Sequence, residues 1–259
     1  IKAGTKVNVV PGKAKAAVEG FEMAALEKAA AETKEETGIS FEFAAEGTVT
    51  EITATGIGAH ASTPDVGNNA LTGLLVFLGK LDFASCPQVD MVRKTASLFP
   101  HGDVNGKTLG VAMEDELSGN LTLSFNMLSV DAASMDGEFD GRIPVCGNDE
   151  NVLEVVRARM AEQGLTLLNK ALIPPHHVSA DSYFVKTLLA AFELYTGRKG
   201  ECQALGGGTY VHHLENGVAF GAAMPETDNK MHGPDEFAVV DELLVSAKIF
   251  AQAIVDLCG

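Results

Sequence analysis

The sequence predicts a mixed α/β chain. Its first part is predicted to be an α+β domain with ferredoxin-like layers, and its last part the βα portion of a doubly wound domain. Strand-like and helix-like patterns alternate through the first part. The pattern changes after a linker at 174–182. The length of 259 residues suits one large domain or two ordinary ones.

The first predicted elements follow a β-β-α-β-β-α order. Two short strands are predicted in 5–20, around a Pro-Gly turn. Residues 21–38 are rich in Ala, Glu and Lys and stop at a glycine, which predicts a helix. Residues 39–59 return to β-branched and aromatic side chains, as the two strands of a hairpin do. Residues 68–81 predict a helix that is buried on most sides.

The strongest strand signal in the chain lies at 120–130. Apolar and polar side chains alternate there, so we expect Ser124 and Asn126 on a face that is open to water. Residues 137–145 are the predicted hairpin partner of this strand. The preceding stretch, 82–118, has weak patterning and is interpreted as a partly helical insertion.

A helix and a strand are predicted to close the first part. Residues 148–164 have an amphipathic pattern, with Asn148 or Asp149 as the N-cap and a glycine as the stop. Residues 165–173 predict a further strand.

The last part has a different order of elements. Residues 182–197 predict a helix, and 201–211 predict a strand that runs into a glycine-rich loop. Residues 216–225 predict a strand of small residues, and 240–257 an amphipathic helix with acidic residues in its first turn. This is a βα piece of a doubly wound domain, too small to be such a domain alone.

Charge and cysteine usage exclude some classes of partner and favour one location. The net charge is −16, from 19 basic and 35 acidic residues, so we expect no nucleic-acid and no membrane partner. The four cysteines are scattered and form no CxxC pair, which suits a reducing cytoplasm. No signal peptide is visible. The chain starts without Met, in what we interpret as a strand, and we expect it to be part of a longer protein.

Two motifs in the first part carry candidate functional side chains. His60 lies in "GIGAHASTPDVGNNA" (56–70), after a strand and before a Ser-Thr-Pro turn. The motif alone leaves open whether this is a functional histidine or a loop histidine that caps or packs. Arg142 lies in "FDGRIPV" (139–145), beside an edge strand, where a guanidinium can bind a carboxylate through two hydrogen bonds. The alternative is a solvated arginine.

Two further motifs lie in the last part. Three consecutive glycines in "LGGGTYVHHLENGVAFG" (205–221) let a ligand approach the backbone, and Thr209 adds a hydroxyl. No lysine follows as in a phosphate-binding P-loop, and His212 and His213 are interpreted as structural. His232, in "DNKMHGPDEF", has the character of a metal ligand, although one imidazole does not hold a catalytic metal.

Taken together and in this order, the motifs resemble one enzyme family. This is the group of cocatalytic zinc aminopeptidases and carboxypeptidases that includes carboxypeptidase G, acetylornithine deacetylase and carnosinase, and within it the branch of the bacterial dipeptidase PepV. The resemblance runs from "AGTKVNVVPGKAKAAVEG" through "GAHASTPDVGNNA", "GRIP", "GGGTY" and "GVAFGA" to "MHGPDEF". It covers nearly the whole chain. The family-like "GGGTYAR" reads "GGGTYVH" here, which puts the role of that arginine in doubt.

The resemblance implies a domain organisation and a metal centre. Residues 1–172 would be a lid domain, with the insertion at 82–118 as a second subdomain, and 173–259 the last part of a zinc-peptidase catalytic domain. Two zinc ions are implied, with cobalt or manganese as possible substitutes, and His232 matches the last zinc ligand. The other ligands would lie in an N-terminal catalytic segment that this chain lacks. We interpret "HGDVN" (101–105) as a decoy of the family's HxD motif.

The resemblance also implies roles for individual residues. His60 would donate a hydrogen bond to the oxyanion, and Arg142 and Asn8 would hold the C-terminal carboxylate of a dipeptide substrate. The loop that contains Gly207, Gly208 and Thr209 would add hydrogen-bond donors at that end. The chain would then be an inactive piece of a zinc dipeptidase, with a monomer favoured and a homodimer possible.

Two other functions stay open at this point. One is a related amidase or deacylase of the same group, because the acyl and amine pockets cannot be deduced from the motifs. The other is a non-catalytic binding or assembly module that uses the lid fold alone.

Overall fold

The computed structural model describes residues 1–221, 223–230 and 235–259. These residues form two units, Ile1–Pro175 and His176–Gly259. Helices and strands are mixed along the chain, which confirms the predicted mixed α/β class at that level. The assignment of 1–172 to a lid and of 173–259 to a catalytic domain stays a prediction.

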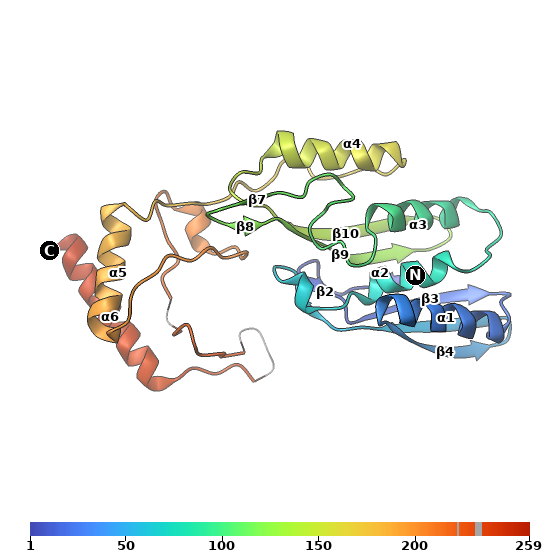
Figure 1. Cartoon of the computed structure of the whole chain (residues 1–259), viewed down its shortest axis with the longest axis horizontal. Helices are drawn as coiled ribbons and strands as arrows, with labels where there is room; N and C mark the ends of the chain where they lie inside the picture. Colours follow the sequence, from blue (N-terminus) through green and yellow to red (C-terminus); the bar gives the residue numbers. More distant parts are fainter. Residues whose placement is uncertain (222, 231–234) are drawn as a thin grey trace. The chain divides into compact units, whose positions relative to one another are not determined.

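An antiparallel six-stranded sheet is the frame of the first unit (Figure 1). Its order is β10-β9-β1-β3-β5-β4, and each neighbouring pair is antiparallel. The strands of this sheet are β1 (Lys2–Ala3), β3 (Lys13–Glu19), β4 (Ser40–Glu46), β5 (Val49–Thr55), β9 (Thr122–Val130) and β10 (Met135–Arg142). The predicted strands at 39–59 and 137–145 are thereby confirmed.

Part of this sheet has a ferredoxin-like connection. Strands β3 and β4 are joined by helix α1 (Met23–Thr37), and β5 lies between them, antiparallel to both. This is a split β-α-β unit. The two-residue strand β1 lies between β3 and β9, so the sheet has one more strand at this point than a simple ferredoxin-like order requires.

Two short ribbons stand beside the main sheet. Strand β2 (Val9–Val10) pairs with β6 (Ala59–His60), and β7 (Glu114–Asp115) pairs with β8 (Gly119–Asn120). Both pairs are antiparallel. The β2–β6 pair, which we call the histidine ribbon, carries one of the predicted site residues.

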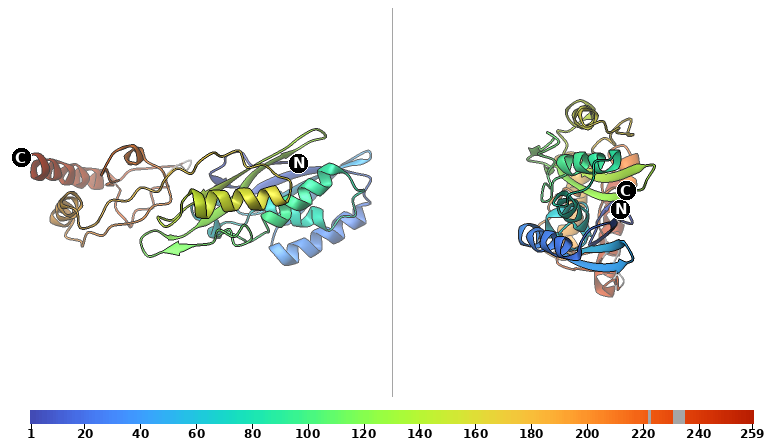
Figure 2. Two further views of the ribbon diagram at one scale, coloured as in Figure 1. Left: turned by 90° about the horizontal axis from the view of Figure 1, so that it is seen from above. Right: turned by 90° about the vertical axis from the view of Figure 1, so that its right-hand side faces the viewer.

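Helices cover one face of the sheet. Helices α1, α2 (Ala70–Gly79) and α3 (Pro87–Leu98) lie side by side in one layer, and Figure 2 shows this layer from two further directions. The 3-10 turn η1 (Pro64–Val66) leads into α2. A π-helical turn, η2 (Asp149–Leu153), begins at the predicted cap Asn148 and continues into α4 (Glu154–Glu162).

The core of the first unit lies between the sheet and this helix layer. Along β3, buried Ala14, Ala16 and Val18 alternate with exposed residues, because successive side chains of a strand point to opposite faces. Helix α2 is buried over most of its surface, as predicted, and Phe77 stacks on Phe41 of β4 with 4.7 Å between ring centroids. Burial of one such side chain stabilises the fold by about 1.5–3 kcal/mol.

The polar face of β9 is not open to water, which corrects the expectation from sequence. Ser124 is 4% exposed and Asn126 is 0% exposed. The chain segment before β2 covers this face, and the Asn126 amide donates a hydrogen bond of 2.6 Å to the carbonyl oxygen of Val7. Gly4 belongs to the same segment, with φ +79°, and a Cβ there would overlap the backbone of Asn126.

Residues 165–173 do not form the predicted strand. Leu165, Leu167 and Leu172 pack against the core of the first unit without a neighbouring strand. The backbone N–H of Leu172 donates instead to the Asp149 carboxylate at 2.8 Å. The apolar residues of this segment therefore reflect packing against the core of the first unit, not pairing in a sheet.

The second unit is built on two packed helices, α5 (Tyr183–Thr196) and α6 (Val240–Cys258), with the short turn η3 (Tyr210–His213) between them in sequence. Both helices were predicted. Ser182 caps α5 through its hydroxyl, and Gly197 ends it in the left-handed conformation. Leu188 of α5 packs with Ile249 and Ala253 of α6 in a small core.

The strands predicted at 201–211 and 216–225 are wrong for the residues that the structure describes. Those residues are loop and 3-10 turn, and within His176–Gly259 the described part contains no strand. A strand needs a neighbour for its backbone N–H and C=O groups, and none of the described segments of this unit supplies one. The doubly wound domain thus stays a prediction.

Helix length and polarity bear on membrane insertion. None of the helices in the described part of the chain has the length and apolar character that crossing a bilayer requires.

One glycine of α2 is required by packing. A Cβ on Gly73 would overlap Ile39 Cγ1 and lie 3.1 Å from Ile39 Cβ, whereas a Cβ on Gly79 would meet no described atom within 4 Å. Ile39 is 0% exposed and cannot turn away.

We therefore expect Gly73→Ala to lower the free energy of unfolding, by up to about 2 kcal/mol. Overpacking costs roughly 1–3 kcal/mol, and the gain for Ala over Gly in a helix offsets ~1 kcal/mol of this cost. Gly79→Ala is the matched control and should leave the free energy unchanged or slightly higher. Urea unfolding of both variants measures the difference, and equal stability of the two would contradict the packing argument.

Candidate functional site

The histidine ribbon places two predicted site residues next to each other. His60 of β6 is directly opposite Val9 of β2. The backbone N–H of Ala61 donates a hydrogen bond of 3.0 Å to the carbonyl oxygen of Asn8, so the ladder continues one residue beyond the ribbon. Asn8 and His60 are both exposed. Two residues that are distant in sequence are thus held at one end of a fixed antiparallel pair.

The imidazole of His60 is held by the turn that follows it. The Ser62 hydroxyl lies 2.7 Å from His60 Nδ1, and the Ser62 backbone N–H donates to the same nitrogen at 3.2 Å. A backbone N–H can only donate, so Nδ1 must be the acceptor nitrogen of a neutral ring, and Nε2 carries the proton. Among the described residues, Nε2 has no hydrogen-bond partner. His60 therefore presents an outward N–H donor.

Arg142, the last residue of β10, is held by a carboxylate on its own strand. Its Nε and Nη2 atoms donate to the two oxygens of Asp140 at 2.6 Å and 2.8 Å. The pair is bidentate and partly buried, with side chains 25% and 11% exposed. Such a pair fixes the plane of the guanidinium better than a single contact does.

The ladder between β9 and β10 relates Arg142 to the histidine ribbon. Arg142 is opposite Thr122, and Asp140 is opposite Ser124, so their side chains share the face of β9 that Asn126 also occupies. Asn126 contacts Val7, next to Asn8 in sequence. Arg142 thus lies on the face of the β9–β10 hairpin that the segment leading to Asn8 and the histidine ribbon also contacts.

Two buried atoms on this face lack hydrogen-bond partners. Thr122 Oγ1 and Asn126 Oδ1 have none among the described residues. The amide of Asn126 cannot be turned over, because its nitrogen is needed by the Val7 carbonyl. An unsatisfied buried oxygen of this kind costs about 1–3 kcal/mol of stability. Side-chain packing alone therefore does not explain why polar residues stand on this face.

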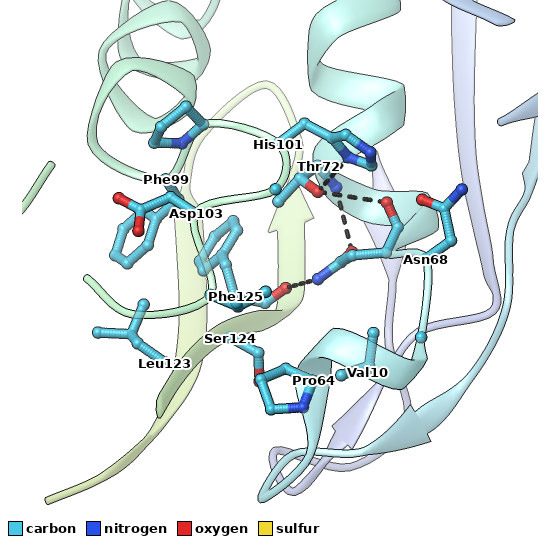
Figure 3. A pocket seen from close by; sticks show the side chains of 15 residues that line it. Val10, Pro64, Asn68, Thr72, Phe99, His101, Asp103, Leu123, Ser124 and Phe125 are labelled. Atoms are coloured by element: carbon cyan, nitrogen blue, oxygen red, sulfur yellow. Dashed lines mark hydrogen bonds between the residues drawn. The ribbon is translucent and has the colours of Figure 1, made fainter. Parts of the chain in front are cut away.

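A small cavity of about 80 Å³ borders the turn that follows His60 (Figure 3). Pro64, Thr72, His101, Ser124 and Phe125 are among the residues that line it. Thr72 Oγ1 lies 2.9 Å from His101 Nδ1, and Figure 3 shows the two side chains pointing toward each other across the cavity wall.

His101 and Asp103 belong to the motif that we interpreted as a decoy, and both have structural partners. Burial lowers the pKa of His101 below its ordinary value. Burial alone would raise the pKa of Asp103, but hydrogen bonds from Thr108, Lys107 and Asn105 outweigh it and lower the pKa. Those backbone N–H groups donate to the Asp103 carboxylate at 2.8 to 3.4 Å. The carboxylate thus stabilises its own loop.

The glycine-rich loop lies in the second unit, and its residues are exposed. A Cβ on Gly207 or Gly208 would meet no described atom within 4 Å. Thr209 caps η3, and its backbone N–H donates to His212 Nδ1 at 3.2 Å. The loop thus leaves its backbone open at the two glycines, while His212 stabilises the turn behind it.

The metal ligand predicted from sequence, His232, lies outside the described residues. Within the residues that the structure describes, no group of three or more His, Cys, Asp or Glu side chains could hold a metal ion. A catalytic zinc needs at least three protein ligands. The described residues therefore do not form a zinc site on their own.

Comparison with known proteins gives the chain its relatives. No family model matches it. The Beta-Ala-Xaa dipeptidase of Lactobacillus delbrueckii subsp. lactis is 32% identical over 257 residues, which are 99% of this chain and 54% of that protein. The "Putative dipeptidase YtjP" of Bacillus subtilis (strain 168) is 34% identical over 261 residues, again 99% of this chain and 54% of the relative.

The chain is homologous to these dipeptidases. The resemblance to a dipeptidase family that the motifs predicted is thereby confirmed. The chain spans about half the length of the curated relatives it matches, at 54% of each.

The sequence analysis did not predict three residues of the candidate site of this chain. Asp140 could have been found, because a side chain two positions before Arg142 on a strand shares its face. Ser62, two residues after His60, was seen only as part of a turn. Asn126 was predicted to lie on a solvent-exposed face of the strand, because no local sequence signal shows which distant segment covers that face.

The lowered pKa of His101 predicts a pH-dependent stability. The folded chain binds the His101 proton less readily than the unfolded chain does, so protonation favours unfolding. Stability should fall as the pH drops below the ordinary value of 6.5. In His101→Gln, the loss of unfolding free energy between about pH 7 and pH 5.5 should be smaller, as urea denaturation at both pH values measures. An unchanged pH dependence would exclude this group as its source.

Proposed function

We propose that the longer protein to which this chain belongs is a metal-dependent dipeptidase. It would hydrolyse dipeptides with a free C-terminal carboxylate, with a zinc-activated water as nucleophile. The chain alone would be inactive, because the zinc ligands other than His232 would come from a part of the longer protein that these 259 residues do not include. Homology over 99% of the chain to proteins named dipeptidases is the observation that carries this proposal.

The chain's own residues would handle the substrate. His60 would donate Nε2–H to the carbonyl oxygen of the scissile bond as negative charge develops on it. A fixed donor of this kind acts mainly on the transition state. The support for this role is the tautomer that the two Ser62 contacts impose on the ring.

The other end of the substrate would be held by a carboxylate clamp. Arg142 would bind the C-terminal carboxylate, and its support is the Asp140 pair that orients the guanidinium. Asn8 would assist from the ribbon, and the Gly207, Gly208 and Thr209 loop would add donors. A clamp that recognises a free carboxylate favours short peptides, since a longer chain has an amide at that position.

We also propose a location and an assembly. The four cysteines are free thiols, which supports the reducing cytoplasm expected from the sequence. A monomer remains the favoured assembly, with a homodimer as the alternative.

Hydrolysis of a dipeptide panel by the longer protein, with zinc, cobalt or manganese added, tests the function. We expect turnover of free dipeptides and loss of turnover on chelation. His60→Ala should lower kcat by about 10²–10³-fold, the effect of removing one oxyanion donor. Turnover of N-acylated amines without turnover of dipeptides would favour a deacylase instead. An unchanged kcat in His60→Ala would remove the oxyanion role.

The clamp is tested by the charge of the substrate end. Arg142→Ala should raise KM for free dipeptides and leave the same dipeptides with amidated C-termini unaffected, because only the former present a carboxylate. Arg159→Ala is a matched control: this arginine lies on α4, in an exposed pair with Glu162 at 3.0 Å. Equal losses on both substrate types would refute the clamp.

A further inference from the structure

We propose that Ser62 is a positioning residue for His60, which fixes the tautomer and the direction of the imidazole. Its catalytic consequence rests on the proposed function, whereas the contact itself is a property of this chain. Ser62 has two contacts with one ring nitrogen, at 2.7 Å from its hydroxyl and 3.2 Å from its backbone N–H.

The backbone N–H decides what the hydroxyl does. It can only donate, so His60 Nδ1 must offer a lone pair, and the Ser62 hydroxyl then donates to the same nitrogen. In the other tautomer, Nδ1–H would point at the Ser62 N–H, and two donors would face each other. The backbone N–H thus disfavours the tautomer that would leave Nε2 without a proton, and the Ser62 hydroxyl adds a second, shorter hydrogen bond to the same nitrogen. The proton is kept at the nitrogen that faces outward.

The turn makes this arrangement local and rigid. The Thr63 backbone N–H donates to the carbonyl oxygen of His60 at 3.0 Å, which closes a β-turn. Ala61 inside the turn is 0% exposed, and its N–H is bonded to Asn8. Pro64, also buried, begins η1 directly after the turn. The backbone therefore holds Ser62 over the ring that precedes it by two residues.

The Ser62 hydroxyl is not needed to satisfy a buried polar group of the fold. In the described part of the chain its hydroxyl forms a hydrogen bond to His60 and to no other residue, and His60 is itself exposed, so water could replace this bond. The Ser62–His60 contact is thus not needed to satisfy a buried group. What it changes is the choice of donor nitrogen on a side chain to which the proposed function gives a contact with the substrate.

Imidazole ¹⁵N resonances of the 259-residue chain test the positioning directly. With ¹⁵N-labelled histidine at about pH 8, long-range ¹H–¹⁵N spectra distinguish a protonated ring nitrogen from an acceptor, and His60→Gln assigns the signals. In the native chain we expect Nε2 protonated and Nδ1 unprotonated. Ser62→Ala keeps the backbone N–H but loses the shorter of the two hydrogen bonds, so both shifts should move part of the way toward the average of the two tautomers. In Ser62→Thr they should stay.

Ser97→Ala serves as the control, since that exposed hydroxyl donates to the Lys94 carbonyl at 2.7 Å and is far along the chain. It should leave the His60 signals unchanged. Native signals already averaged, or signals identical in native and Ser62→Ala chains, would overturn the proposal.

Kinetics of the longer protein test the consequence. Ser62→Ala should lower kcat about tenfold, the lower end for partners that orient a functional histidine, with KM within about twofold. Ser62→Thr should restore kcat. A threonine variant as impaired as the alanine variant, or an alanine variant with native kcat, would contradict the positioning role. If His60→Ala is also fully active, the proposed oxyanion role of His60 fails, while the ¹⁵N result still decides the contact.

Discussion

The candidate site depends on one buried amide. Asn126 is 0% exposed in the middle of β9, and its Nδ2 donates to the Val7 carbonyl and to Ser124 Oγ, at 2.6 and 2.8 Å. The first of these bonds joins positions 119 residues apart. It fixes the segment that carries Asn8, and this segment continues directly into β2 of the histidine ribbon. A buried polar side chain destabilises the fold unless it forms hydrogen bonds. The hydrogen bond that Asn126 needs therefore specifies the position of the histidine ribbon.

Of the groups that the proposed reaction needs, the described residues supply those for substrate binding but not those for metal binding. They supply an imidazole donor, an oriented guanidinium and an open glycine loop, all of which can bind a peptide. They supply no cluster of three metal-binding side chains. This division agrees with homology to proteins of which the chain spans about half.

Elements with local signals were predictable, and elements that depend on distant partners were not. Gly38, Asn148, Ser182 and Gly197 end or begin helices where the sequence indicated, because capping is decided within one turn. The predicted strands at 165–173, 201–211 and 216–225 failed for the opposite reason: an extended apolar segment becomes a strand only where another strand accepts it.

The same distinction holds for the site. His60, Arg142 and Asn8 are proposed as site residues from family-like motifs, which carry information that no periodicity contains. Their neighbour Asp140 follows from the predicted strand, because it lies two positions before Arg142. The contacts of Ser62 and Asn126 become visible only once the turn and the covering segment are known. Burial of the polar face of β9 required the fold of residues far from it in sequence.

The contact between Gly73 and Ile39 has a consequence for sequence change in this chain. The side chains at the two positions share one fixed volume between α2 and the start of β4, so substitutions at one position depend on the residue at the other. A methyl group gained by the helix has to be compensated by a smaller side chain at the strand, and homologues should show this as paired variation of a small and a large residue.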